Sequence, residues 1–185
     1  MEFSAWDHRI DTFYREEFTA HDPERTVAAM SHLLGTMKAD DAGALVPFEM
    51  AGVHDSLGLE DDAVPLYREA LAAGLDASHA ARARIQLAST LRNLNDRRNL
   101  NDAGNIGRMD EVFALLAVPA EGDLEPARKA FLALALHSAG RPDEALREAI
   151  EGIVPNLTRY QRSLADYAAA LTEALPGALT KTLPE

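Results

Sequence analysis

The chain of 185 residues has no cysteine, few aromatic residues and fewer basic than acidic side chains. The absence of cysteine excludes disulfide bonds and thiolate metal sites. Eighteen Lys and Arg residues stand against thirty Asp and Glu residues, so the formal net charge is −12. Nucleic acids and anionic membranes both attract clustered cations. We therefore expect neither a nucleic acid nor a membrane surface as the partner.

Long apolar runs are also missing from the chain. No stretch approaches the roughly 18 apolar residues that would span a bilayer. The N-terminus shows no basic region followed by an apolar one, the pattern of a secretory signal. These absences predict a cytoplasmic protein.

Catalytic and metal-binding motifs are absent as well. The sequence contains no HExxH, no GxSxG and no glycine-rich phosphate loop. Six histidines are scattered along it, and the neighbours His54 and Asp55 would point about 100° apart on a helix. We therefore expect no metal, no cofactor and no catalysis.

What the chain does have is helical periodicity. Apolar residues recur at steps of three and four, and no segment alternates with period two, so we expect an all-α fold. A first helix should cover Phe3 to Phe18, and Asp22-Pro23 should cap and begin a second. These two form an N-terminal helical pair over residues 1–40, followed by a break from Asp40 to Gly43.

An internal repeat is the strongest signal. Gly58, Gly107 and Gly140 are each followed by two variable residues, an Asp, an acid and a small or branched apolar residue. Such a glycine takes the left-handed conformation that ends a helix. The acids then fall in the first turn of the next helix, where its dipole favours negative charge. The spacing predicts stacked helical hairpins that turn at the three glycines.

This pattern resembles the tetratricopeptide repeat, a helix-turn-helix unit of about 34 residues. The closer resemblance is to a bacterial subgroup, the tetratrico peptide repeat group 5 proteins. The phrases that carry it are His54-Asp55-Ser56-Leu57-Gly58, Ala63-Val64-Pro65-Leu66-Tyr67-Arg68 and Gln86-Leu87-Ala88-Ser89-Thr90-Leu91-Arg92-Asn93-Leu94. The resemblance covers roughly Leu45 to Leu171.

The resemblance implies one domain over residues 1–185, an all-α, right-handed solenoid of about three hairpins. Repeats would occupy residues 44–154, after the N-terminal helices, and a capping helix that opens at Pro155-Asn156 would occupy residues 155–175. The implied function is a scaffold that binds a protein or peptide, with a homodimer as one expected form and no reaction.

Two stretches depart from a clean repeat. Pro65 lies inside a predicted helix, where proline can cost about 3 kcal/mol, so this helix should start late or kink. The second repeat should turn near Asn95, but its glycine, Gly107, comes twelve residues later. Residues 95–106 form this insertion, in which the stretch Arg92 to Arg97 is nearly copied at Arg98 to Asp102. This tandem segment should form an exposed loop or a helix extension.

The resemblance also implies a concave binding surface on the first helix of each repeat. It would be lined in the first repeat by Phe48 and Gly52, among others. The partner-binding residues that we expect on this surface are Asp55, Arg82, Ser89, Arg92, Asn93 and His137. The planar guanidinium of Arg92 suits a carboxylate, which could belong to a ligand or to Asp55 itself. The alternative is a small-molecule-binding or catalytic helical protein that uses His54, Asp55, Arg92 and His137.

The N-terminal helix concentrates aromatic residues on one face. This face comprises Phe3, Trp6, Ile10, Phe13 and Phe18. It could cap the first repeat within the chain, since solenoids need terminal caps. It could also form the seam of a homodimer, since exposed apolar patches are rare on monomers. The sequence leaves both interpretations open.

Overall fold

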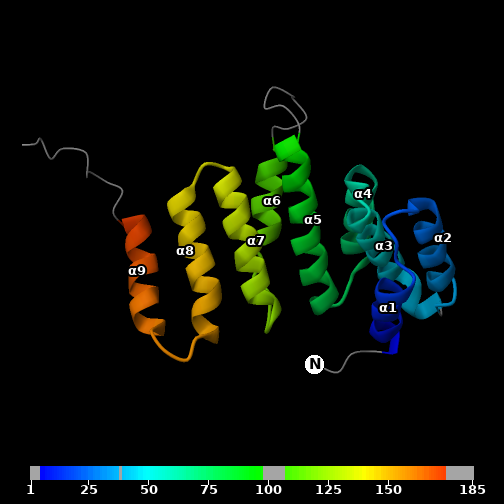
Figure 1. Cartoon of the computed structure of the whole chain (residues 1–185), viewed down its shortest axis with the longest axis horizontal. Coiled ribbons are helices and arrows are strands. Elements are labelled where there is room, and N and C mark those ends of the chain that lie inside the picture. The colour runs from blue at the N-terminus through cyan, green and yellow to red at the C-terminus, as the bar shows by residue number, and fades with distance from the viewer. Residues whose placement is uncertain (1–4, 38, 98–106, 174–185) are drawn as a thin grey trace, which may run out of the picture. The chain divides into compact units, whose positions relative to one another are not determined.

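The computed structural model describes residues 5–37, 39–97 and 107–173. Over these residues it contains nine α-helices, one short 3-10 helix and no strand (Figure 1). The all-α prediction is confirmed. The chain divides into two compact units, an N-terminal unit of Met1–Thr90 and a C-terminal unit of Leu91–Glu185.

The N-terminal unit is built on five helices, of which the last continues into the next unit. They are α1 (Ala5–Glu16), α2 (Pro23–Leu34), α3 (Ala39–Ser56), α4 (Glu60–Ala73) and α5 (Ala77–Arg97). One core cluster joins the first three through Ile10, Phe13, Met30, Leu34 and Val53. The predicted start of α2 is confirmed, because the side chain of Asp22 accepts a hydrogen bond from the amide of Arg25 at 3.1 Å.

The hairpin of α3 and α4 turns at Gly58, as the repeat predicts. Gly58 has a φ of 75°, the left-handed conformation that glycine adopts without strain. The amide of Gly58 donates to the Asp55 carbonyl at 2.9 Å, and the amide of Leu59 donates to the His54 carbonyl at 2.8 Å. These bonds satisfy carbonyls that the end of α3 would otherwise leave unpaired. The two helices then pack along each other.

Two boundary predictions in this unit are wrong. The expected break at Asp40 to Gly43 lies inside α3, which begins at Ala39. Of the two outcomes expected at Pro65, the late start is wrong, because α4 begins at Glu60 and runs through the proline, and the kink stays a prediction. Buried Ala63, Val64 and Tyr67 surround that position. Packing therefore outweighs the penalty of about 3 kcal/mol that proline carries in a helix.

The C-terminal unit starts with the last turns of α5. The helices that follow are α6 (Arg108–Leu116), α7 (Leu124–Ser138), α8 (Pro142–Ile153), the 3-10 helix η2 (Val154–Asn156) and α9 (Gln161–Glu173). Helix α7 packs on α6 and α8, and α8 packs on α9. The predicted turn glycines are left-handed, with φ of 94° at Gly107 and 73° at Gly140. Helix α5 continues through Asn95 to Arg97, and the rest of the predicted insertion, residues 98–106, lies outside the described residues.

The predicted start of the capping helix is wrong. Pro155 and Asn156 belong to η2, which follows α8 directly, and α9 begins only at Gln161. The extended backbone of Leu157 and the positive φ of 67° at Tyr160 separate the two helices. Proline lacks an amide donor and fixes its own φ, which suits a tight turn at this point. The end of the predicted cap, residues 174–175, lies outside the described residues.

Arg128 of α7 connects the end of α6 to α7 through hydrogen bonds. The side chain is buried, and its Nε and Nη2 atoms donate to Glu125 at 2.7 and 2.6 Å. Its Nη1 atom donates to the carbonyl oxygen of Leu116, the last residue of α6. Glu125 also accepts from the amide of Ala120 at 2.9 Å. A buried charge is tolerated here because its donors are paired.

Candidate functional site

Helix α1 lies directly against α3 at a glycine. A Cβ atom on Gly52 would stand 3.1 Å from the Tyr14 hydroxyl, which is closer than a normal contact. The Ser56 side chain, one helical turn further along α3, hydrogen-bonds Tyr14. Burial is the main reason why the pKa of Tyr14 is raised to about 12. The absence of a side chain at residue 52 therefore makes room for the ring of another helix.

Helix α1 also reaches α5, beyond α3. Asp7 Oδ1 lies 3.6 Å from Nε2 of His79 in the first turn of α5, and His79 Nδ1 bonds Asp76, which directly precedes that helix. In stacked repeats each hairpin contacts only its neighbours. A helix that touches both α3 and α5 therefore lies across the first repeat instead of adding one more repeat to the stack.

A buried glutamate lies where these three helices meet. Glu49 on α3 is 3% exposed, and burial raises its pKa to about 7. Electrostatic interactions with Arg82 and His79 on α5 act in the opposite direction, and Asp7 and Asp11 on α1 raise the pKa further. We call the surface formed by Gly52, Ser56, His79 and Arg82, with Glu49 between them, the α1-binding surface.

Asp55 connects three helices of the same unit. Its Oδ2 atom accepts from the Tyr67 hydroxyl of α4 at 3.4 Å, and its Oδ1 atom lies 2.9 Å from Thr90 Oγ1 on α5. Thr90 Oγ1 also lies 2.9 Å from the carbonyl oxygen of Gln86. The single hydroxyl hydrogen can serve only one acceptor at a time. Burial is the main cause that raises the pKa of Asp55, and the hydrogen bonds from Thr90 and Tyr67 act in the opposite direction.

The expected lining residue Phe48 is not open to solvent. It is 2% exposed and lies against three side chains of α4 and α5. Its ring centroid is 6.4 Å from that of Tyr67 and 5.6 Å from that of His79, edge to face. The guanidinium of Arg82 lies 5.2 Å from the ring of Phe48, within the range of a cation–π contact. Phe48 therefore packs against His79 and Arg82, two residues of the α1-binding surface.

The six predicted partner-binding residues fall in both units. Asp55, Arg82 and Ser89 are half-buried in the N-terminal unit. In the C-terminal unit, Arg92 donates from Nη2 to Asn93 Oδ1 at 3.0 Å, and His137 is exposed on α7.

The N-terminal apolar face lies within the chain for the most part. Ile10 and Phe13 are 5% and 1% exposed, and Trp6 and Phe18 are half-buried against the same cluster. Phe3 lies outside the described residues.

Sequence reasoning missed Glu49, Tyr14 and His79. Two signals could have indicated them. Glu49 is a single acid in an otherwise apolar stretch of α3. Asp7 and Tyr14 are seven residues apart, so they lie on one face of α1 next to its apolar face. The contacts between these residues depend on how α1 crosses the repeat, which periodicity does not specify.

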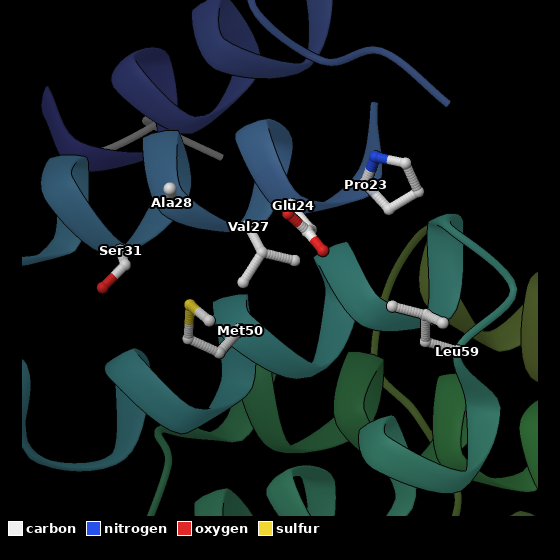
Figure 2. Close-up of a pocket in the computed structure, with 7 residues that line it drawn as sticks. All are labelled: Pro23, Glu24, Val27, Ala28, Ser31, Met50 and Leu59. Atoms are coloured by element: carbon white, nitrogen blue, oxygen red, sulfur yellow. The ribbon is translucent and has the colours of Figure 1, made fainter. Parts of the chain in front are cut away.

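A depression lies between α2 and the α3–α4 hairpin, apart from the α1-binding surface. It has a volume of about 460 Å³ and is lined mainly by apolar side chains. In Figure 2, Val27 of α2 and Met50 of α3 point toward each other across it. Its complete lining is Pro23, Glu24, Val27, Ala28, Ser31, Met50 and Leu59. None of the predicted partner-binding residues lines this depression.

The described parts of the chain lack two kinds of feature. No group of three His, Asp or Glu side chains in residues 5–37, 39–97 and 107–173 could hold a metal ion. Within the same ranges, no helix combines the length and the apolar character that crossing a membrane requires.

Antiparallel helical hairpins with left-handed glycine turns define a helical-repeat protein. The family model described as Tetratrico peptide repeat, TPR_5, matches residues 44–171, which is most of the chain. The chain therefore belongs to the tetratricopeptide repeat family, and its fold class is the all-α solenoid. Domains of this family generally bind protein partners. Comparison with curated proteins and with solved structures gave no match.

Proposed function

We propose that the chain is a non-catalytic scaffold that binds a protein or peptide segment on one face of α3 and α5. The observation that carries the proposal is the close approach of Tyr14 to Gly52. It supports the proposal because Tyr14 is an aromatic side chain of another helix and lies at short range on the side of α3 that faces α1. Asp55 on α3, together with Arg82 and Ser89 on α5, belongs to the same two helices.

The charges on this face support recognition of a polar segment. Arg82 and His79 are cationic or potentially cationic, and they come from the first turns of α5. Burial raises the pKa of the neighbouring Glu49 to about 7. The negative charge of Glu49 is therefore reduced near neutral pH, and Arg82 and His79 can interact with acidic groups of a partner.

The hydrogen bonds of His54 and Asp55 argue for binding rather than catalysis. His54 Nδ1 lies 2.7 Å from the carbonyl oxygen of Met50 in its own helix. Asp55 is engaged by Thr90 and Tyr67. Both residues of the alternative catalytic set that lie in the N-terminal unit are thus held by structural partners. For Arg92, Asn93 and His137 of the C-terminal unit, partner binding is a separate proposal.

Site-specific photo-crosslinking tests the proposal. A photoreactive residue is placed at Arg82 or Ser89 of the full chain, and at exposed Glu69 of α4 as the matched control. We expect the first two positions to crosslink one protein partner in cells, and the control to give none. Crosslinks from Glu69 alone, or a small molecule co-purifying with no protein crosslink, would contradict the proposal.

Arg92 offers a separate test in the C-terminal unit. Its Nε atom is buried and has no hydrogen-bond partner in the described parts of the chain. A partner carboxylate would suit this geometry. If Arg92 binds the partner, Arg92→Ala should fold normally and lose the crosslinked complex. Loss of stability with binding retained would instead assign Arg92 a structural role.

A further inference from the structure

Helix α1 covers the face of α3 and α5 on which the proposed function depends. Tyr14 occupies the space above Gly52, and Asp7 faces His79. A partner segment cannot contact these groups while α1 lies there. The chain therefore contains a segment of its own at the proposed binding surface.

We propose that α1 is an intramolecular ligand of this surface, and that the partner presents an acidic, aromatic amphipathic helix that replaces it. This inference rests on the proposed function and names the chemistry of the partner. The occupant follows from the contacts of α1, because any helix that replaces it must satisfy the same groups.

The contacts of α1 define the pattern that a partner helix needs. An acidic residue must face His79, as Asp7 does. Apolar residues three and six positions later must fill the space of Ile10 and Phe13, which are almost completely buried. A tyrosine seven positions after the acid must lie over Gly52 and bond Ser56. These spacings lie along adjoining faces of one helix.

The position of α1 distinguishes it from an ordinary repeat helix. A helix in register with the stack would contact the neighbouring hairpin and no other. Asp7 instead reaches α5, and Asp7 and Asp11 both raise the pKa of Glu49 on α3. Helix α1 therefore contacts the polar groups of the surface as a bound helix would. Helix α1 also packs in one apolar cluster with α2, which holds it near the surface. Its effective concentration as an intramolecular ligand is therefore high.

A peptide competition experiment on the full chain tests the inference. The probe is a fluorescein-labelled peptide with the sequence of residues 1–18 and the substitution Trp6→Phe, so that Trp6, the single tryptophan of the chain, reports only on α1. The chain variant Tyr14→Ala weakens the attachment of α1. Glu16→Ala, at an exposed position of the same helix, is the matched control.

We expect the peptide to bind the Tyr14→Ala chain at least about tenfold more tightly than wild type or Glu16→Ala, because the closed state lowers the apparent affinity. Trp6 emission of the variant should shift to the red as α1 is released. A peptide that itself carries Tyr14→Ala should not bind. If Tyr14→Ala does not fold by circular dichroism, Asp7→Lys replaces it, since the new charge faces His79.

Equal affinity for all three chains, or no binding to the weakened chain, would overturn the inference. In that case α1 is a fixed cap. Crosslinking of a protein partner from Ser89, which lies on α5 outside the α1-binding surface, would then still support the proposed function, so the two proposals fail separately.

Discussion

The hydroxyl of Tyr14 lies 3.1 Å from the position that a Cβ atom of Gly52 would occupy. Both residues are held in place, since Gly52 is buried within α3 and Tyr14 is bonded by Ser56. The contact connects the N-terminal helix to the first repeat at a point where no other residue type fits without displacement. It also permits a comparison of two glycines in one helix.

The first prediction compares Gly52→Ala with Gly43→Ala. Both lie in α3, and alanine in place of glycine in a helix gains about 0.5–1 kcal/mol. A Cβ atom on Gly43 would meet nothing within 4 Å, so Gly43→Ala should raise the free energy of unfolding. Gly52→Ala must displace Tyr14 and should lower it, since overpacking costs about 1–3 kcal/mol. Urea denaturation measures both.

A double-mutant cycle with Tyr14→Phe isolates the contact. Removing the hydroxyl should relieve the clash, so Gly52→Ala should be less damaging in the Tyr14→Phe background. Additive effects, or equal stabilisation by both alanines, would show that α1 does not press against Gly52.

The second prediction concerns the pH dependence of Glu49→Gln. The pKa of Glu49 is about 7 in the folded chain against 4.5 for an ordinary glutamate. A raised pKa contributes stability that is complete below pH 4.5 and is lost as the pH rises through 7. The loss amounts to about 3 kcal/mol at 1.36 kcal/mol per unit. Glu49→Gln should therefore gain on wild type over this range.

Unfolding free energies at pH 4 and pH 8 decide the matter. Exposed Glu69→Gln on α4 is the control. If the curves for wild type and Glu49→Gln run parallel between the two pH values, Glu49 does not titrate near neutrality and the description of its surroundings is wrong.

The third prediction compares two arginines with the same local pairing. Arg128 and Arg141 each form two hydrogen bonds to a glutamate three residues later or earlier. Arg128 is buried and also donates to the Leu116 carbonyl, whereas Arg141 is exposed. Arg128→Ala should lower stability by about 2–3 kcal/mol, because buried acceptors lose their donors. Arg141→Ala should remain close to wild type in thermal unfolding. Similar losses in both variants would contradict the role of Arg128.

The fourth prediction uses two threonines that bond the carbonyl four residues earlier. Thr90 bonds Gln86 and Thr12 bonds His8, but Thr90 also contacts Asp55. Thr90→Val should cost about 1–3 kcal/mol, because Asp55 and the Gln86 carbonyl lose a partner. Thr12→Val, at an exposed position, should cost much less. If chemical denaturation ranks the two variants in the opposite order, this would contradict the role of Asp55 in connecting α3, α4 and α5.

Local signals in the sequence predicted the fold well. The left-handed glycines at 58, 107 and 140 and the cap at Asp22 depend on chemistry within a few residues, and all four are confirmed. Boundaries were less predictable. Helix α3 extends through Asp40 to Gly43 and α4 through Pro65, because packing of later residues outweighs local preference.

The candidate site depends on contacts that periodicity does not contain. The family resemblance implied that Phe48 and Gly52 line a surface, but α1 covers Gly52, and α4 and α5 enclose Phe48. Glu49 and His79 acquire their significance only from the crossing of α1 over α3 to α5. An amphipathic helix can pack its apolar face in several positions, and tertiary packing, which periodicity does not encode, selects the crossing.

The contact from α1 to α5 is the central claim, and a crosslink tests it most directly. The chain has no cysteine, so Asp7→Cys with His79→Cys creates a unique pair for a short bis-maleimide. Mass spectrometry of the full chain should find an intramolecular crosslink in a monomer, and the single-cysteine variants should give none. A folded double variant that forms no crosslink, or only one between two copies, would contradict the placement of α1 across the first repeat.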